Sequence, residues 1–275
     1  MDKLDRLGWA SGMSIEAFGV RVGFRVKDPE VLRLLPERFP FGWKPSTSAR
    51  VDRLYSVDIP KNSPNSRVRR FGLLYGDATQ LARTLNTEDL LDILEGDLRL
   101  YVAENARRRT FVHAGVVGWK GRAILFPGRS FSGKTTLVAG LIRAGATYSS
   151  DEYAVLDAKG RVHPFAKPLS IRHRGRKQSD QSAESLGGVS GRKPLPVGLV
   201  ILCRWNGKRW RPKALSQGLG TLEMIAHTVS ARRSPTDSLM AIQSVVLKAP
   251  ILQSSRGEVG EAVEGIFAYT QAAGW

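Results

Sequence analysis

The chain has 275 residues, enough for one large domain or two smaller ones. Hydrophobic residues make up 42% of the chain and charged residues 24%, which excludes a wholly disordered, collagen-like or coiled-coil protein. Lys and Arg total 42 against 25 for Asp and Glu, and the resulting net charge of +17 favours an anionic partner.

Several features bear on the compartment. Cys203 is the only cysteine, so we expect no internal disulfide and no multi-cysteine zinc site. The first twenty residues interrupt their apolar residues with Asp2, Asp5 and Glu16, which predicts no secretory signal. No stretch approaches the roughly 20 apolar residues of a membrane-spanning helix. Together these features predict a soluble, cytoplasmic protein.

The first 110 residues predict a smaller β-plus-helix portion, a candidate partner- or substrate-binding part of the chain. Alternating apolar residues predict its strands, and an acidic first turn followed by an apolar stripe predicts its helix. The expected elements are strands at 15–26, 51–59 and 67–75, and a helix with Thr87 as its N-cap that runs through Val102.

Residues 111–275 predict a second, larger domain in which strands and helices alternate. This alternation favours an α/β fold, with α+β as the alternative. The expected elements are a hairpin of 111–119 and 122–127, a helix at 134–144 that ends at Gly145, strands at 146–150 and 153–157, a long polar loop at 173–194, a second hairpin around Asn206-Gly207, helices at 221–229, 238–247 and 258–269, and a strand at 251–254.

A phosphate-binding motif lies between the first hairpin and its helix. Residues 128–135 match G-x-x-x-x-G-K-[ST] in full, and the flanking strand and helix are the context that this motif requires. In such a loop, backbone N–H groups and the lysine bind phosphate oxygens, and the hydroxyl after the lysine binds Mg²⁺. The candidate nucleotide-binding residues are Gly128, Arg129, Ser130, Phe131, Ser132, Gly133, Lys134, Thr135 and Thr136.

An acidic pair, Asp151-Glu152, follows Lys134 at short range. One carboxylate of such a pair can hold Mg²⁺ while its neighbour accepts a proton from an attacking hydroxyl. The alternative is a structural turn whose acids form ion pairs with nearby arginines. With Thr135, the two acids are our candidate metal ligands.

These motifs together resemble the catalytic domain of HPr kinase/phosphorylase and its relatives, whose fold is akin to phosphoenolpyruvate carboxykinase. The resemblance is carried by 113–116, 124–136, 141–145 and 150–152, and it covers roughly 111–172 well. It implies ATP- and Mg²⁺-dependent phosphorylation of a serine-like hydroxyl on a peptide, protein or small molecule. It further implies Asp151 as the base, Glu152 at the metal and His113 near the transferred phosphate.

The positive charge is concentrated after the acidic pair. Residues 159–213 hold 14 basic and two acidic side chains. Within this segment, Arg172 is the candidate to contact the transferring phosphate, since a guanidinium can bridge two oxygens; the alternative is an ion pair with Asp151 or Glu152. Trp205 and Trp210 could stack on nucleic-acid bases, although aromatic residues near a hairpin turn are more often packing residues.

Two other functions compete with a kinase. One is a nucleotide-sensing binding module without turnover, in which ATP sets the conformation. The other is a nucleic-acid-binding ATPase, which the charge allows but no nucleic-acid motif supports.

Overall fold

The computed structural model describes residues 2–61, 69–129, 132–171 and 179–275. The chain divides into two compact units, Met1–Arg107 (unit 1) and Arg108–Trp275 (unit 2). The division falls three residues before the boundary drawn from the sequence. No helix in the described ranges combines the length and hydropathy needed to span a membrane.

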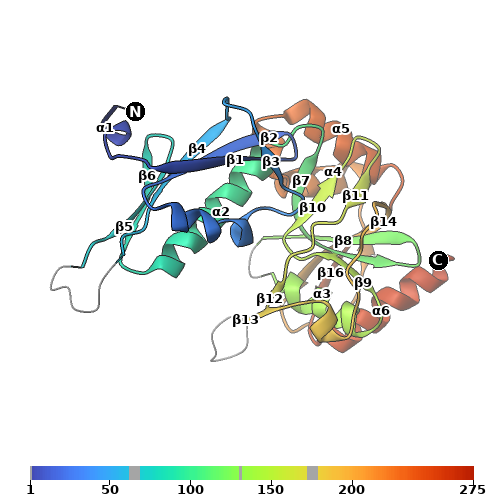
Figure 1. Ribbon diagram of the computed structural model, residues 1–275. Helices are drawn as coiled ribbons and strands as arrows, with labels where there is room; N and C mark the ends of the chain where they lie inside the picture. The colour runs from blue at the N-terminus through green and yellow to red at the C-terminus, as the bar shows by residue number, and fades with distance from the viewer. Residues whose placement is uncertain (1, 62–68, 130–131, 172–178) are drawn as a thin grey trace. The chain divides into compact units, whose positions relative to one another are not determined.

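The described residues of unit 1 form a six-stranded sheet in the order β3-β1-β2-β4-β5-β6, with helix α2 packed on one face (Figure 1). The apolar stripe of α2, from Leu90 to Val102, meets the buried side chains of the central strands in a single core. Its elements are α1 (Asp2–Asp5), β1 (Ser11–Ala17), β2 (Val20–Val26), the 3₁₀ helices η1 (Pro29–Arg33) and η2 (Pro36–Arg38), β3 (Lys44–Ser46), β4 (Arg53–Asp58), β5 (Gly72–Gly76), β6 (Thr79–Thr84) and α2 (Thr87–Asn105).

Unit 2 is a mixed sheet covered by helices on both faces. The sheet runs in the order β11-β10-β7-β8-β14-β16-β15, and β9 pairs with β7 beside β10. Its elements are β7 (Thr110–Trp119), β8 (Arg122–Pro127), α3 (Lys134–Arg143), β9 (Thr147–Ser150), β10 (Tyr153–Leu156), β11 (Arg161–His163), β12 (Leu169–Ile171), β13 (Ser179–Gln181), η3 (Glu184–Leu186), β14 (Leu195–Trp205), β15 (Lys213–Ala214), α4 (Gln217–Ala226), η4 (Val229–Arg232), α5 (Pro235–Val246), β16 (Ile251–Arg256) and α6 (Val259–Ala272).

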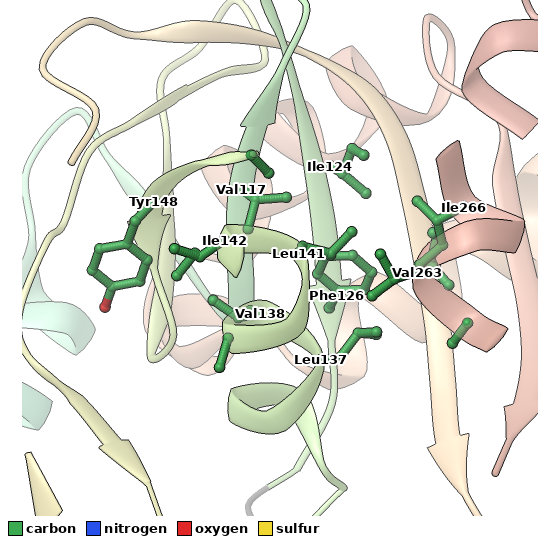
Figure 2. Close-up of a cluster of buried hydrophobic side chains, with 14 of the residues drawn as sticks. Val117, Ile124, Phe126, Leu137, Val138, Leu141, Ile142, Tyr148, Val263 and Ile266 are labelled. Atoms are coloured by element: carbon green, nitrogen blue, oxygen red, sulfur yellow. The ribbon is translucent and has the colours of Figure 1, made fainter. Parts of the chain in front are cut away.

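Alternation along the strands of unit 2 builds two cores. Ile124 and Phe126 of β8 point to the face covered by α3 and α6, where they meet Leu141 and Ile266 (Figure 2). The intervening Leu125 belongs to the core on the other face, which α4 and α5 cover. Because successive side chains of a strand point to opposite faces, this is the pattern expected of a sheet buried on both sides. The α/β class predicted from the sequence is therefore correct at this level.

Several predicted elements differ from the structure. The single strand predicted at 15–26 is a hairpin, β1–β2, because Phe18 and Gly19 adopt positive φ values of 51° and 79° and reverse the chain. The N-cap of α2 is Asn86, whose side chain accepts a hydrogen bond from the Glu88 N–H, and not Thr87. Within the strand predicted at 67–75, β5 begins only at Gly72, and 62–68 lie outside the described residues.

Two further predictions in unit 2 are wrong in part. The Asn206-Gly207 turn does not close a hairpin, because β14 pairs in parallel with β8 and β16 and the chain after the turn pairs with β16 through β15. The segment predicted as a loop at 173–194 contains β13 and η3, although 172–178 are not described. The other elements predicted for this unit occur within a few residues of their predicted positions, whereas the short strands β11 and β12 were not predicted.

Candidate functional site

The segment 128–135 carries the phosphate-binding motif and is called the P-loop below, after that motif. It joins the carboxyl end of β8 to the first turn of α3, as the motif predicts. Gly133, the last residue before the helix, has φ +87°, a conformation that favours glycine. A Cβ at Gly133 would also collide with the guanidinium of Arg256 and lie 3.5 Å from Trp205 Cβ. Only glycine therefore fits at this point of the loop. Ser130 and Phe131 lie outside the described residues, while the side chains of Arg129 and Thr136 are exposed.

Lys134 is buried beneath the loop that precedes it. Its Nζ donates hydrogen bonds to the carbonyl oxygens of Gly128, at 2.8 Å, and Arg129, at 2.7 Å. Burial lowers the pKa of Lys134 to about 8, and the nearby charge of Asp151 opposes this shift. An anion bound in the loop would stabilise the charged form of this lysine. Lys134 is thus placed inside the loop that the motif assigns to phosphate.

Strand β7 supports the loop from the side through His113 and Gly115. A Cβ at Gly115 would approach Val138 Cγ2 of α3 to 2.7 Å, so the absence of a side chain there lets the helix pack close to the strand. His113 Nδ1 lies 2.6 Å from the carbonyl oxygen of Gly128, at the start of the P-loop. Burial, followed by the charge of Lys134, lowers the pKa of His113. A neutral imidazole that donates from Nδ1 fits this contact, and it holds the loop entrance in place.

The acidic pair interrupts a strand that runs beside β7. Ser150 of β9 pairs with Val116, and Tyr153 of β10 pairs with His113, so Asp151 and Glu152 lie between the two pairings. The carbonyl of Glu152 still accepts a hydrogen bond from the Ala114 N–H. Because β8 lies on the opposite edge of β7, this register brings the acids next to the P-loop.

Asp151 is the acid that faces Thr135. Thr135 Oγ1 donates to Asp151 Oδ2 at 3.4 Å, and the Tyr148 hydroxyl lies 3.3 Å from Asp151 Oδ1 while donating to the Lys167 carbonyl at 2.7 Å. Asp151 is only 8% exposed. Burial raises its pKa, against the lowering effect of the Lys167 charge.

Glu152 has a different environment. Its side chain is 25% exposed and forms an ion pair with Lys167, with Nζ 3.3 Å from Oε2. The alternative to a catalytic pair was a structural turn whose acids form ion pairs with arginines. Glu152 does form an ion pair, but with a lysine. Arg172, the other candidate partner and the candidate phosphate ligand, lies outside the described residues.

Arg256, at the carboxyl end of β16, is a site residue that the sequence did not reveal. It is 3% exposed, and its Nη2 donates to the carbonyl oxygen of Gly133 at 2.8 Å. Its Nη1 donates to the Gly257 carbonyl. Within the described ranges no carboxylate forms an ion pair with it; burial lowers its pKa, although the charge of Glu258 acts to raise it. The sequence did contain a general signal for Arg256: it ends a strand of an α/β fold, and the carboxyl ends of parallel strands gather at one edge of the sheet, where ligands bind.

The side chains of the basic segment 159–213 lie in different surroundings. Asp157 accepts hydrogen bonds from Arg161 and lies 3.0 Å from His163 Nε2, so part of this charge is neutralised locally. Trp210 packs against Gly265 of α6, which confirms the packing interpretation for this residue. Trp205 is 57% exposed, so the same interpretation is wrong for it.

Comparison with known proteins adds no assignment. No protein-family model matches the chain, and the search of curated proteins returned no match.

Proposed function

We propose that unit 2 is an ATP- and Mg²⁺-dependent kinase that transfers the γ-phosphate to a hydroxyl group of a peptide, protein or small molecule. One observation carries the proposal: the Thr135 hydroxyl at the start of α3 and the buried carboxylate of Asp151 are 3.4 Å apart, beside Lys134. We further propose a fold of the HPr kinase type, supported by the hairpin that leads into the P-loop and the acidic pair across β7.

The residues at the loop fit a nucleotide polyphosphate. Ser132 Oγ is buried and has no hydrogen-bond partner among the described residues, and Lys134 and Arg256 are buried cations bonded to backbone carbonyls. Phosphate oxygens would provide an acceptor for the hydroxyl and counter-charges for both cations. The N–H groups of the first turn of α3 add further donors at the positive end of the helix dipole.

The donor set also fits Mg²⁺. A threonine hydroxyl and a carboxylate are hard oxygen ligands, and P-loop enzymes complete the metal shell with phosphate oxygens and water. Thr135 and Asp151 would hold the ion. When bound, Mg²⁺ would neutralise charge on the β- and γ-phosphate oxygens.

This geometry modifies the roles that the family resemblance implies. Asp151, which faces Thr135, is our metal-side acid, and Glu152, which is more exposed and held by Lys167, is our proton acceptor. The hydroxyl oxygen of the acceptor forms a bond to the γ-phosphorus, and the bond from that phosphorus to the β–γ bridging oxygen breaks. The hydroxyl proton passes to Glu152, and ADP leaves with the electron pair of the broken bond.

In this proposal His113 is a positioning residue, and Arg256 both holds the loop and binds phosphate. Each donates a hydrogen bond to a backbone carbonyl of the P-loop, His113 at its first glycine and Arg256 at its last. Holding both ends of the loop fixes the direction of its N–H groups before the nucleotide arrives, which reduces the cost of ordering on binding.

The test is transfer of label from γ-labelled ATP with Mg²⁺ into a cell lysate separated into protein, nucleic-acid and small-molecule fractions. We expect label in one fraction with the native chain, none with Lys134→Ala, and native behaviour with Lys44→Ala, an exposed lysine of β3. ATP binding without Lys134-dependent transfer into any fraction would favour a nucleotide-sensing module.

A further inference from the structure

A pocket of about 890 Å³ adjoins the P-loop at the carboxyl ends of β8, β14 and β16. Its volume lies in the range of sites that bind small molecules and cofactors. Gly128, Arg129 and Ser132 of the P-loop form one wall. The opposite wall comes from the ends of β14 and β16 and the chain after β14, including Leu202, Trp205, Asn206, Arg211, Gln253 and Ser254.

The strand order places this pocket and the acidic pair on opposite sides of the P-loop. The sheet runs β10-β7-β8-β14-β16, the P-loop follows β8, and the acids lie beyond β7. Most of the pocket lining lies toward β14 and β16, and Glu223 and His227, in and just after α4, complete it. A nucleotide whose terminal phosphate meets Thr135 and Asp151 therefore extends away from the acids, across the loop and toward the pocket.

The lining has the chemistry that a nucleoside requires. The Trp205 side chain is 57% exposed and begins beside Gly133, so a flat aromatic surface stands at the edge of the phosphate site. Asn206 donates to Ser255 Oγ at 2.9 Å, and Ser254 Oγ accepts from the Arg211 N–H at 3.0 Å, so polar groups are already ordered around the pocket. An aromatic surface for a base, with fixed polar groups for a sugar, is a recurring arrangement for nucleotides.

We propose that this pocket is the nucleoside subsite: the base stacks on Trp205 and the ribose lies against the polar groups at the ends of β14 and β16. The inference rests on the proposed function, because it requires a polyphosphate in the P-loop. It also gives Trp205 a role that does not require nucleic-acid binding, because the base of a single nucleotide is enough to occupy its aromatic surface.

Titration calorimetry with two probes tests the proposal on the full chain. ATP and inorganic tripolyphosphate, each with Mg²⁺, share the phosphate chain but differ in the nucleoside. We expect Trp205→Ala to weaken ATP binding about tenfold to hundredfold, the range of a lost base–aromatic stack, and to change tripolyphosphate binding less than about twofold. Trp205→Phe keeps a stacking surface and should restore most of the ATP affinity.

Two controls make the outcomes distinct. Trp9→Ala removes a tryptophan of unit 1 and should leave both affinities unchanged, and thermal melting should show that each variant folds. If Trp205→Ala leaves ATP binding intact, or weakens both probes equally, the nucleoside subsite is wrong while the phosphate site stands. If the native chain binds neither probe, the proposed function fails and the inference fails with it.

Discussion

Arg256 is a buried cation whose hydrogen bonds go to the backbone carbonyls of Gly133 and Gly257. The nearby charge of Glu258 offsets only part of the cost of burying this guanidinium, and no described carboxylate forms an ion pair with it, which fits a residue that receives an anion. We expect Arg256→Met to weaken ATP and tripolyphosphate to the same extent, by about tenfold or more, because a charge-assisted hydrogen bond is worth about 1.5–3 kcal/mol. Titration calorimetry measures this, with Arg256→Lys as the variant that retains the charge. Unchanged tripolyphosphate affinity would contradict the account.

Substitutions of the two adjacent acids, Asp151 and Glu152, should have different kinetic effects. Asp151 faces Thr135, so Asp151→Asn should raise the Mg²⁺ concentration needed for half-maximal transfer. Glu152→Gln should leave that Mg²⁺ requirement unchanged and lower kcat about a hundredfold or more, the usual contribution of a general base. The measurement is the rate of transfer as a function of Mg²⁺ concentration for each variant. The opposite result, with Glu152→Gln changing the metal requirement, would restore the roles that the family resemblance implies.

At this scale the local motif predicted Lys134 and Thr135, the family resemblance added His113, and Arg256, which the fold brings to the loop, was missed. Lys134 and Thr135 are recognisable because the loop and the start of its helix are contiguous. Arg256 is 123 positions from the carbonyl that it contacts, and nothing in its local sequence indicates that contact. His113 contacts the carbonyl of Gly128 at the loop entrance, a contact that depends on the pairing of β7 with β8.

At the scale of single elements, the turn between β10 and β11 should make a pH-dependent contribution to stability. Asp157 accepts hydrogen bonds from the backbone N–H groups of Lys159 and Arg161 and from the Arg161 side chain, and lies beside His163. Burial alone would raise the pKa of Asp157, but these partners lower this pKa from 3.8 to about 2. Because the folded-state pKa is depressed, the carboxylate contributes stability above about pH 4, and this contribution is lost as the pH falls through about 2.

Asp157→Asn should therefore lower the free energy of unfolding by about 2 kcal/mol at pH 7. The difference from the native chain should shrink as the pH falls from about 4 toward 2, because the native aspartate also loses its charge there. Urea unfolding curves over this pH range provide the measurement. A difference that stays constant with pH would show that the ionised carboxylate is not the source of the stability.

The elements predicted correctly are those in which the local sequence pattern agrees with the strand pairing that the fold adopts. The hairpin of β7 and β8 follows from two apolar runs and a two-residue turn, and it forms as expected. The Asn206-Gly207 turn is an equally good local signal, yet β14 pairs in parallel with β8 and β16. The turn itself forms, with Gly207 at φ 76°, but β14 is buried between two parallel neighbours and leaves no edge for a hairpin partner. Such long-range pairing cannot be deduced from turn residues alone.

At the scale of the whole molecule, each hydrophobic core formed by the described residues lies within one unit. One core contains only residues of unit 1, and the other two contain only residues of unit 2. All the described residues of the proposed site also belong to unit 2. A fragment of residues 108–275 should therefore unfold in one cooperative transition and bind tripolyphosphate within about threefold of the full chain, since a unit with its own core can fold alone. Loss of cooperative unfolding or of binding would show that unit 1 is required.

The most direct test of the central claim is a parallel measurement of ADP and of acid-stable phosphoester, using γ-labelled ATP and the acceptor fraction that takes the label. For a kinase, the two products form in equal amounts with the native chain, and both fall at least a hundredfold with Asp151→Asn at a fixed, low Mg²⁺ concentration. Equal rates for the native chain and Asp151→Asn, or ADP formed only with free phosphate in every fraction, would contradict phosphoryl transfer to a hydroxyl at this site.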